Sequence, residues 1–455
     1  MTKSTNNTGV ASEGTKKRIL YCLDFDGVLC DSVNETFLSG LRACKLLRSA
    51  NEQASSSTST ADWIDALEKD PQRMQEIQED FRYVRPILYV GWEAILLIRL
   101  LASDIEGEIA GTSLDWKNKD SEEASTISKR EAVFRMFHNA ADVKDNESDN
   151  CAATSFREHA LKNWGLSADE YGSAMSEARK SWISEGSSGG GNGTSWIDAH
   201  GFYRGSCEAV GEFLKSRGNE DVYVITTKAK EFALRLLEKQ NLYQSNADNQ
   251  DGESPPSATS FIKESQVYGL GSGPKASVLQ QILEACQAKE DASNNNNNSD
   301  GTPRTEYVAV MVEDNVATLD RISKSLVGEK VMPVVASWGY NSNEQLVDVL
   351  LSTKTMDKQQ NHYVVLPLLT DSARLSAREN AKTAGVYADR AKSKDPTGCS
   401  LASILLTPFD AGSLMANTGK DKDEAEQNTD DSYDFVSNVD IPQLYFQQKY
   451  QTSQC

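Results

Sequence analysis

Short apolar runs rich in Val, Ile and Tyr recur along this chain, and helical patterns separate them. The runs that read as buried strands cover residues 18–25, 222–226, 266–269, 307–312 and 331–336. Amphipathic helical spacing covers residues 208–217, 229–240, 276–286 and 316–326. Strands that alternate with helices in this way predict an α/β fold, with a parallel sheet covered by helices on both faces.

The first and second predicted strands are separated by about 200 residues, far more than one crossover helix needs. Helical periodicity covers much of this insert, at 62–81 and 155–184, and Pro86 is placed to begin an apolar helix that runs through Leu101. The insert therefore predicts a separate helical domain inserted into the sheet domain.

These patterns predict four regions in the chain. A disordered tail covers 1–17, the α/β core covers 18–33 and 200–410, the helical cap covers 34–199, and a solvated acidic tail covers 411–455. Polar low-complexity runs are predicted as surface loops at 51–60, 142–150, 187–194, 245–260 and 293–300.

Composition narrows the possible partners. The formal net charge is -20 and Lys and Arg form no basic stripe, which disfavours nucleic acid as a partner. No apolar run reaches the length of a membrane span, and the N-terminal residues lack the features of a secretory signal, so we expect a soluble protein with no membrane partner. The expected location is the cytoplasm, with the plastid left open. Eight scattered cysteines fit buried reduced thiols, and the sequence predicts no oligomeric state.

The strongest chemical signal is LDFDGVLCDS, residues 23–32, in which two carboxylates two positions apart follow a strand. Asp24 and Asp26 can face one pocket at the carboxyl end of that strand, and two neighbouring anions favour a divalent cation. An ordinary acidic turn after a strand is the alternative interpretation, because Asp-Gly is common in turns.

Three further signals follow later strands. Thr226 ends the strand in VYVITTK, and its hydroxyl could hold a phosphate oxygen. Lys275 follows the glycine-rich GLGSGPK at the start of a helix, where its charge could meet a phosphate. Glu313 and Asp314 end the strand in VAVMVEDN, and with Asp24 and the main-chain carbonyl of Asp26 they can complete an oxygen-only magnesium site.

Each of these signals also has a structural interpretation. Threonine is common in strands, a lysine at a helix start is often solvated, and an Asp-Asn pair is a good helix N-cap. What strengthens the functional interpretation is that all four signals lie at predicted strand ends, where parallel α/β sheets bind ligands.

In this order the four segments resemble the haloacid dehalogenase (HAD) superfamily of phosphatases, and the insert resembles its C1 cap. The segment HGFYRGSCEAVGEFL, residues 200–214, is similar to the phosphoglycolate-phosphatase-like subgroup. The resemblance implies a Rossmann-like core with an inserted helical cap, and a Mg²⁺-dependent phosphatase that acts on a small phosphorylated metabolite. It assigns the following roles: Asp24 as nucleophile, Asp26 as general acid/base, Thr226 and Lys275 as phosphate binders, and Asp314 as a magnesium ligand.

One position departs from the family pattern, because Thr318 stands where a second acid is usual, four residues after Asp314. Glu313 or Asp320 could substitute, and we favour Glu313. Two rival functions remain: a phosphomutase or phosphotransferase of the same fold, and a non-catalytic binding protein. In the insert, Arg82 or Arg85 could meet a substrate anion or could simply pack within the cap.

Overall fold

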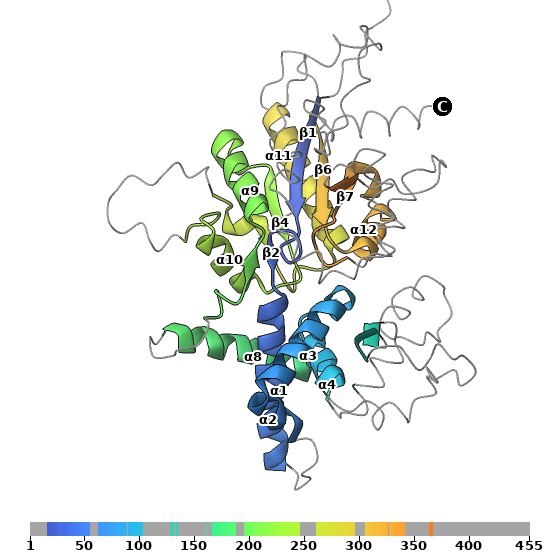
Figure 1. Ribbon diagram of the computed structural model, residues 1–455. Coiled ribbons are helices and arrows are strands. Elements are labelled where there is room, and N and C mark those ends of the chain that lie inside the picture. Colours follow the sequence, from blue (N-terminus) through green and yellow to red (C-terminus); the bar gives the residue numbers. More distant parts are fainter. Residues whose placement is uncertain are drawn as a thin grey trace, which may run out of the picture.

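The computed structural model describes residues 16–54, 62–88, 90–102, 129–131, 133–134, 161, 166–187, 195–245, 261–295, 305–325, 327–341 and 364–366. Its centre is a six-stranded parallel sheet with the strand order β5-β4-β1-β6-β7-β8 (Figure 1). These strands are β1 (Lys16–Leu23), β4 (Val222–Ile225), β5 (Val267–Tyr268), β6 (Thr305–Glu313), β7 (Val331–Ala336) and β8 (Val364–Leu366). The predicted α/β class is confirmed, and the strand order is Rossmann-like.

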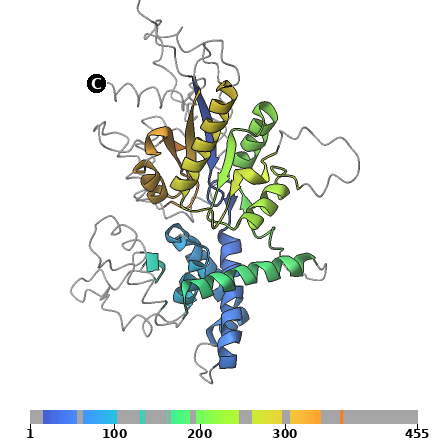
Figure 2. The same cartoon turned by 180° about the vertical axis from the view of Figure 1, so that it is seen from behind.

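Helices cover both faces of this sheet, which explains why its strands are continuously apolar. Along β1, Ile19 and Tyr21 pack on one side, whereas Leu20 and Cys22 pack on the other, as the two-residue period of a strand requires. The first side is covered by α9 (Arg204–Arg217) and α10 (Lys230–Lys239), and the second, seen in Figure 2, by α11 (Lys275–Asn295) and α12 (Val316–Ser323). Short 3-10 turns lie at η6 (Glu264–Gln266) and η7 (Gly328–Lys330).

Some predicted boundaries in the sheet were wrong. The predicted tail at 1–17 overlaps β1, because Lys16 and Lys17 already pair with β6. Strand β8 was not predicted, and β4 ends at Ile225, one residue before Thr226. Two helices extend into predicted low-complexity loops, α1 to Ala54 and α11 to Asn295. Most of those loops, and the predicted acidic tail, lie outside the described residues.

Between β1 and β4 the chain forms a helical unit with a hydrophobic core of its own (Figure 1). Its described elements are α1 (Val33–Ala54), α2 (Asp62–Lys69), α3 (Pro71–Val84), the 3-10 turn η1 (Arg85–Ile87), α4 (Glu93–Ala102) and α8 (Ala168–Ser187). The chain enters and leaves this unit through a small antiparallel ribbon, in which β2 (Cys30–Asp31) pairs with β3 (Gly201–Phe202). The two connections therefore lie side by side.

Local capping corrects two helix predictions in this unit. Pro86 does not begin the long helix: it lies in η1, and α4 begins at Glu93, whose carboxylate accepts a hydrogen bond from the Val90 amide at 3.2 Å. The single helix predicted over 62–81 is broken, because Asp70 caps α3 and Pro71 occupies its first turn. A residue before proline is disfavoured in helical conformation.

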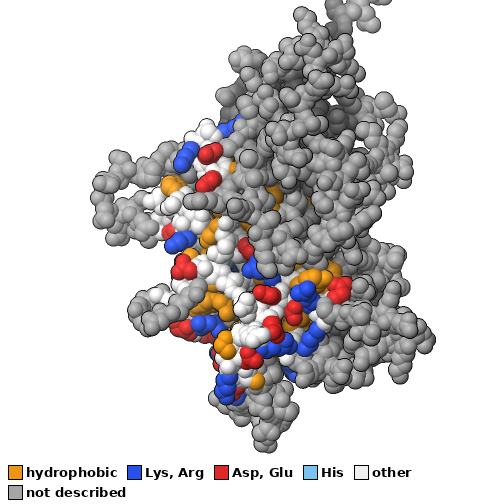
Figure 3. All heavy atoms as spheres, viewed as in Figure 1, with side chains coloured by type: hydrophobic (Ala, Val, Ile, Leu, Met, Phe, Trp, Pro, Cys, Tyr) orange, Lys and Arg blue, Asp and Glu red, His pale blue; other side chains and the backbone are white. Residues whose placement is uncertain are grey.

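Charged side chains of both signs are interspersed over the described surface of the helical unit in Figure 3. Many pair across neighbouring turns or helices, as Arg42 does with Glu185 and Arg73 with Glu76. No helix among the described residues is long and apolar enough to cross a membrane. The five cysteines of the described ranges are free and buried: Cys22, Cys30, Cys44, Cys207 and Cys286.

Candidate metal and phosphate site

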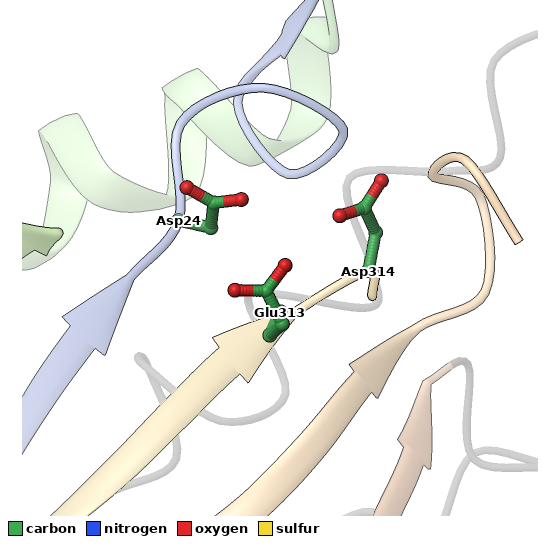
Figure 4. A group of neighbouring side chains, drawn as sticks. All are labelled: Asp24, Glu313 and Asp314. Atoms are coloured by element: carbon green, nitrogen blue, oxygen red, sulfur yellow. The ribbon is translucent and has the colours of Figure 1, made fainter. Parts of the chain in front are cut away.

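Three carboxylates meet at the carboxyl ends of β1 and β6. These strands are neighbours, with Leu23 in register with Val312, and the Asp24 amide donates to the Val312 carbonyl at 2.9 Å. Asp24 therefore lies beside Glu313, the last residue of β6, and Asp314 follows directly. One carboxylate oxygen from each residue lies within 4.8 Å of the other two, and Figure 4 shows the side chains converging on one space. We call Asp24, Glu313 and Asp314 the acidic group.

The position of this group follows from the sheet topology. From β1 the chain continues to β4 and β5 on one side, and later to β6, β7 and β8 on the other. Strand order thus changes direction between β1 and β6, and ligands of open parallel sheets bind at such a switch point.

Asp314 is fixed by close backbone contacts. Its Oδ2 accepts a hydrogen bond from the Tyr340 amide at 2.6 Å. Gly27, at φ +86°, lies so close that an added Cβ would be 1.9 Å from Asp314 Oδ2, and a Cβ on Gly339 would be 2.3 Å from Asp314 Cβ. The glycine after Asp26 is therefore needed both for its conformation and for the space that it leaves.

Lys275 supplies the positive charge beside the acidic group. It is the first residue of α11, and its Nζ lies 2.9 Å from Asp24 Oδ1 and 2.5 Å from Glu313 Oε2. Burial alone would lower the pKa of Lys275, but these two carboxylates raise it overall, so the side chain remains an ammonium ion.

The pKa values of all three carboxyls in the acidic group are raised. Burial, followed by the charge of Glu313, raises the pKa of Asp24 well above its usual range despite Lys275, and burial also raises the pKa of Glu313. Burial and the charge of Asp24 raise the pKa of Asp314 to about 6. If all three carboxylates were ionised, one ammonium would leave two negative charges, and buried charges are costly unless they are paired or coordinate a metal. An oxygen-only donor set of this kind suits a hard divalent cation.

The carboxylate of Asp26 is not part of the acidic group. Its Oδ1 lies 3.4 Å from Lys228 Nζ. The same Nζ lies 3.7 Å from the buried carboxylate of Glu35. The residue also forms an isolated bridge with Cys30, which closes the loop after β1. The Asp26 side chain is therefore not a member of the acidic group, and the prediction that its main-chain carbonyl binds the metal stays a prediction.

Thr226 lies directly after β4 and is buried, and its Oγ1 accepts a hydrogen bond from the Lys228 amide at 3.1 Å. It shares with Lys275 the lining of a cavity of about 250 Å³, together with the glycine-rich loop at 269–274. The structure thus places the two predicted phosphate binders around one space.

Thr318 lies in the first turn of α12 and lines the cavity that Thr226 and Lys275 share. Its amide donates to the N-cap residue Asn315 at 2.9 Å, and its hydroxyl accepts from Arg321 at 3.1 Å. Among the described residues Glu313, and not Asp320, joins Asp24 and Asp314. The geometry thus agrees with the choice of adjacent acids over an acid one turn into the helix.

The two arginines considered for a substrate anion make contacts with their own surroundings. Arg82 forms an ion pair with Asp31 at 3.1 Å, and the Arg85 guanidinium lies 3.8 Å from the centre of the Tyr340 ring. The Tyr340 hydroxyl in turn accepts a hydrogen bond from the Ser32 amide at 2.7 Å. These contacts tie the helical unit to the loop that fixes Asp314.

Sequence reasoning missed Lys228 and Glu35, and it considered the segment 338–341 for the rim of the pocket without finding the contact that Tyr340 makes with Asp314. Lys228 stands two residues after Thr226 and could have been found as a cation at a strand end. Glu35 gave no local signal, because an acid in the first turn of a helix is common. Tyr340 acts on Asp314 through its backbone amide, which any residue carries.

No family model, curated protein or solved structure matches this chain.

Proposed function

We propose that this protein is a Mg²⁺-dependent phosphatase of the haloacid dehalogenase type, acting on a small phosphorylated metabolite, with the helical unit as its C1 cap. The observation that carries the proposal is the acidic group with Lys275 at the switch point of the parallel sheet. This arrangement combines a nucleophile, a cation site and a phosphate-binding ammonium within a few ångströms.

The donor set fits a divalent cation. Asp24, Glu313 and Asp314 offer buried carboxylate oxygens, and burial is the main cause of their raised pKa values, to which the charges of the neighbouring carboxylates add. When bound there, Mg²⁺ would offset the repulsion between Asp24 and an anionic phosphate. Histidine and cysteine, which favour zinc, are absent from the group.

The protein's own residues would then carry the reaction. A carboxylate oxygen of Asp24 attacks phosphorus and forms an aspartyl-phosphate, while the bond from phosphorus to the ester oxygen breaks. Asp26 gives its proton to the leaving alkoxide, and in the second step takes a proton from the water that cleaves the aspartyl-phosphate. Lys275 and Thr226 bind the phosphoryl oxygens in both steps.

A phosphomutase would use the same residues and differ only in the acceptor, a substrate hydroxyl in place of water. A non-catalytic binding protein would keep the acidic group and show no turnover. Hydrolysis assays distinguish both from a phosphatase.

The test is hydrolysis of a chromogenic phosphate ester and of a panel of phosphorylated metabolites, with and without MgCl₂. The expected result is Mg²⁺-dependent release of phosphate that is lost in Asp24→Asn and retained in Glu185→Gln, which removes only an exposed ion pair. Transfer of phosphate to an added sugar phosphate would indicate a mutase. Absence of turnover on the whole panel would contradict the proposal.

A further inference from the structure

A second cluster of charged groups lies where the helical unit meets the sheet. Glu35, in the first turn of α1, is fully buried. Its carboxylate accepts hydrogen bonds from Arg179 of α8 at 2.7 and 3.0 Å, from Ser39 at 2.6 Å and from the Trp196 indole at 3.1 Å. The partners from α8 and from the turn before β3 hold this carboxylate in one position.

Lys228 brings the sheet domain into the same cluster. It lies beyond the end of β4 and is only 5 % exposed, and its Nζ is 3.7 Å from Glu35 Oε2 and 3.4 Å from Asp26 Oδ1. The ammonium thus bridges a carboxylate of the helical unit and a carboxylate of the loop after β1. Through this ammonium the helical unit and the sheet domain are joined by a buried ion pair.

The cluster differs electrically from the acidic group. Burial lowers the pKa of His200 to about 4 despite the nearby Glu35, so this ring is neutral. Its Nδ1 is 2.9 Å from the Trp196 carbonyl, the contact that orients the ring. Glu35 and an ionised Asp26 then face two cations, Arg179 and Lys228, so the charges balance without any added ion before Asp26 takes up the proton that it transfers. The cluster is therefore a permanent link between charged side chains and not a second metal site.

The contacts of Glu35 restrict the position of the Lys228 ammonium. Arg179 makes two parallel hydrogen bonds to Glu35, a bidentate pair that fixes both direction and position. Glu35 in turn limits where the Lys228 ammonium can lie, because a buried cation stays near its counter-charges. Without Glu35, Lys228 would be free to move relative to Asp26.

We propose that Glu35 is a positioning residue, which holds Lys228 against Asp26 and so orients the acid/base carboxylate only while the helical unit is docked on the sheet. This role rests on the proposed phosphatase function, in which Asp26 transfers the proton. Docking of the helical unit then becomes a requirement for chemistry as well as for enclosure of the substrate.

The test is a double-mutant cycle on steady-state kinetics with Glu35→Gln, Lys228→Met and the double variant. Glutamine keeps the size of Glu35 and an oxygen that can accept from Ser39 and Trp196. The expected result for Glu35→Gln is a kcat about tenfold lower with KM changed less than about twofold, since proton transfer is impaired and ground-state binding is not. In the Lys228→Met background the same substitution should lower kcat no further.

Matched controls separate positioning from folding. Glu185→Gln removes an exposed ion pair between the same two helices, α1 and α8, and should leave kcat unchanged. Lys228→Arg keeps the bridging charge and should retain more of the activity than Lys228→Met. If Glu35→Gln fails to fold, the double variant Glu35→Gln/Arg179→Met serves in its place, because it removes both charges of the buried Glu35–Arg179 ion pair. The same loss of kcat is expected for this double variant.

Two outcomes overturn this inference. One is an unchanged kcat in Glu35→Gln, and the other is an equal loss of kcat from Glu35→Gln in both Lys228 backgrounds, which would show a structural role alone. Absence of turnover in the unmodified protein would be a different result, because it overturns the proposed function from which the positioning role follows.

Discussion

The contact between Gly27 and Asp314 gives the sharpest test of how the backbone builds the site. In Gly27→Ala the new methyl would lie 1.9 Å from Asp314 Oδ2, and the residue would have to keep φ +86°. The left-handed conformation costs about 1–2 kcal/mol for alanine. Displacement of the Asp314 carboxylate from the Tyr340 amide adds about 1.5–3 kcal/mol, the usual value of a hydrogen bond to a charged group.

Two other glycines separate these contributions. Gly271 has φ +93° and nothing within 4 Å of an added Cβ, so Gly271→Ala carries the conformational cost alone. Gly339→Ala would place its Cβ 2.3 Å from Asp314 Cβ, so it carries the steric conflict. The comparison therefore distinguishes strain in the loop after β1 from loss of the Asp314 position.

The assay is thermal unfolding followed by circular dichroism, with and without millimolar MgCl₂. The two contributions sum to about 2.5–5 kcal/mol, so at ~2–4 °C per kcal/mol Gly27→Ala should lower the melting temperature by roughly 10 °C. The variant should also lose the stabilisation by Mg²⁺. Gly339→Ala should also lose that stabilisation, whereas Gly271→Ala should keep it. The reasoning is refuted if Gly27→Ala and Gly271→Ala show the same loss of stability and the same response to Mg²⁺.

Three further outcomes are expected. Burial raises the pKa of Asp314 to about 6, so the folded chain binds this proton more readily than the unfolded chain does. The metal-free protein should therefore gain stability as the pH falls from about 7 to about 5, and this gain should shrink in Asp314→Asn, measured by urea unfolding at each pH. Arg179→Met leaves Glu35 buried without its main partner and should lower the free energy of unfolding by about 3–5 kcal/mol in the same assay. Glu185→Gln, which removes an exposed ion pair, should lower it by less than about 1 kcal/mol. Equal effects of the two substitutions would contradict a stabilising role for the buried pair. Lys275→Met should lower kcat about 10²–10³-fold while Mg²⁺ still binds, and an unchanged kcat would exclude Lys275 from phosphate binding.

Strand ends were the part of the site that the sequence could predict. Asp24, Thr226 and Glu313 each follow or end an apolar run, and the parallel sheet brings such positions to one edge. Lys275 was predictable for a related reason, because a glycine-rich turn before a helix places its first residue at that edge. The local pattern was sufficient wherever the sheet itself fixed the position.

Contacts between segments far apart in the chain could not be predicted in this way. Glu35 and Arg179 are 144 positions apart, and neither has a neighbour in sequence that marks it as buried. Pro86 misled the helix prediction because its position suits a helix start, while the capping contact between Glu93 and the Val90 amide decided the boundary. Tertiary contacts of this kind produce no periodic pattern in the sequence.

The central claim is that Asp24, Glu313 and Asp314 together hold one divalent cation. Calorimetric titration of the metal-free protein with MgCl₂ tests it most directly, alongside Asp24→Asn, Asp314→Asn and the surface control Glu185→Gln. We predict one ion bound per chain in the unmodified protein and in Glu185→Gln, and a loss of binding in the other two variants. Binding that persists unchanged in Asp24→Asn and Asp314→Asn, or no binding by the unmodified protein, would contradict the account.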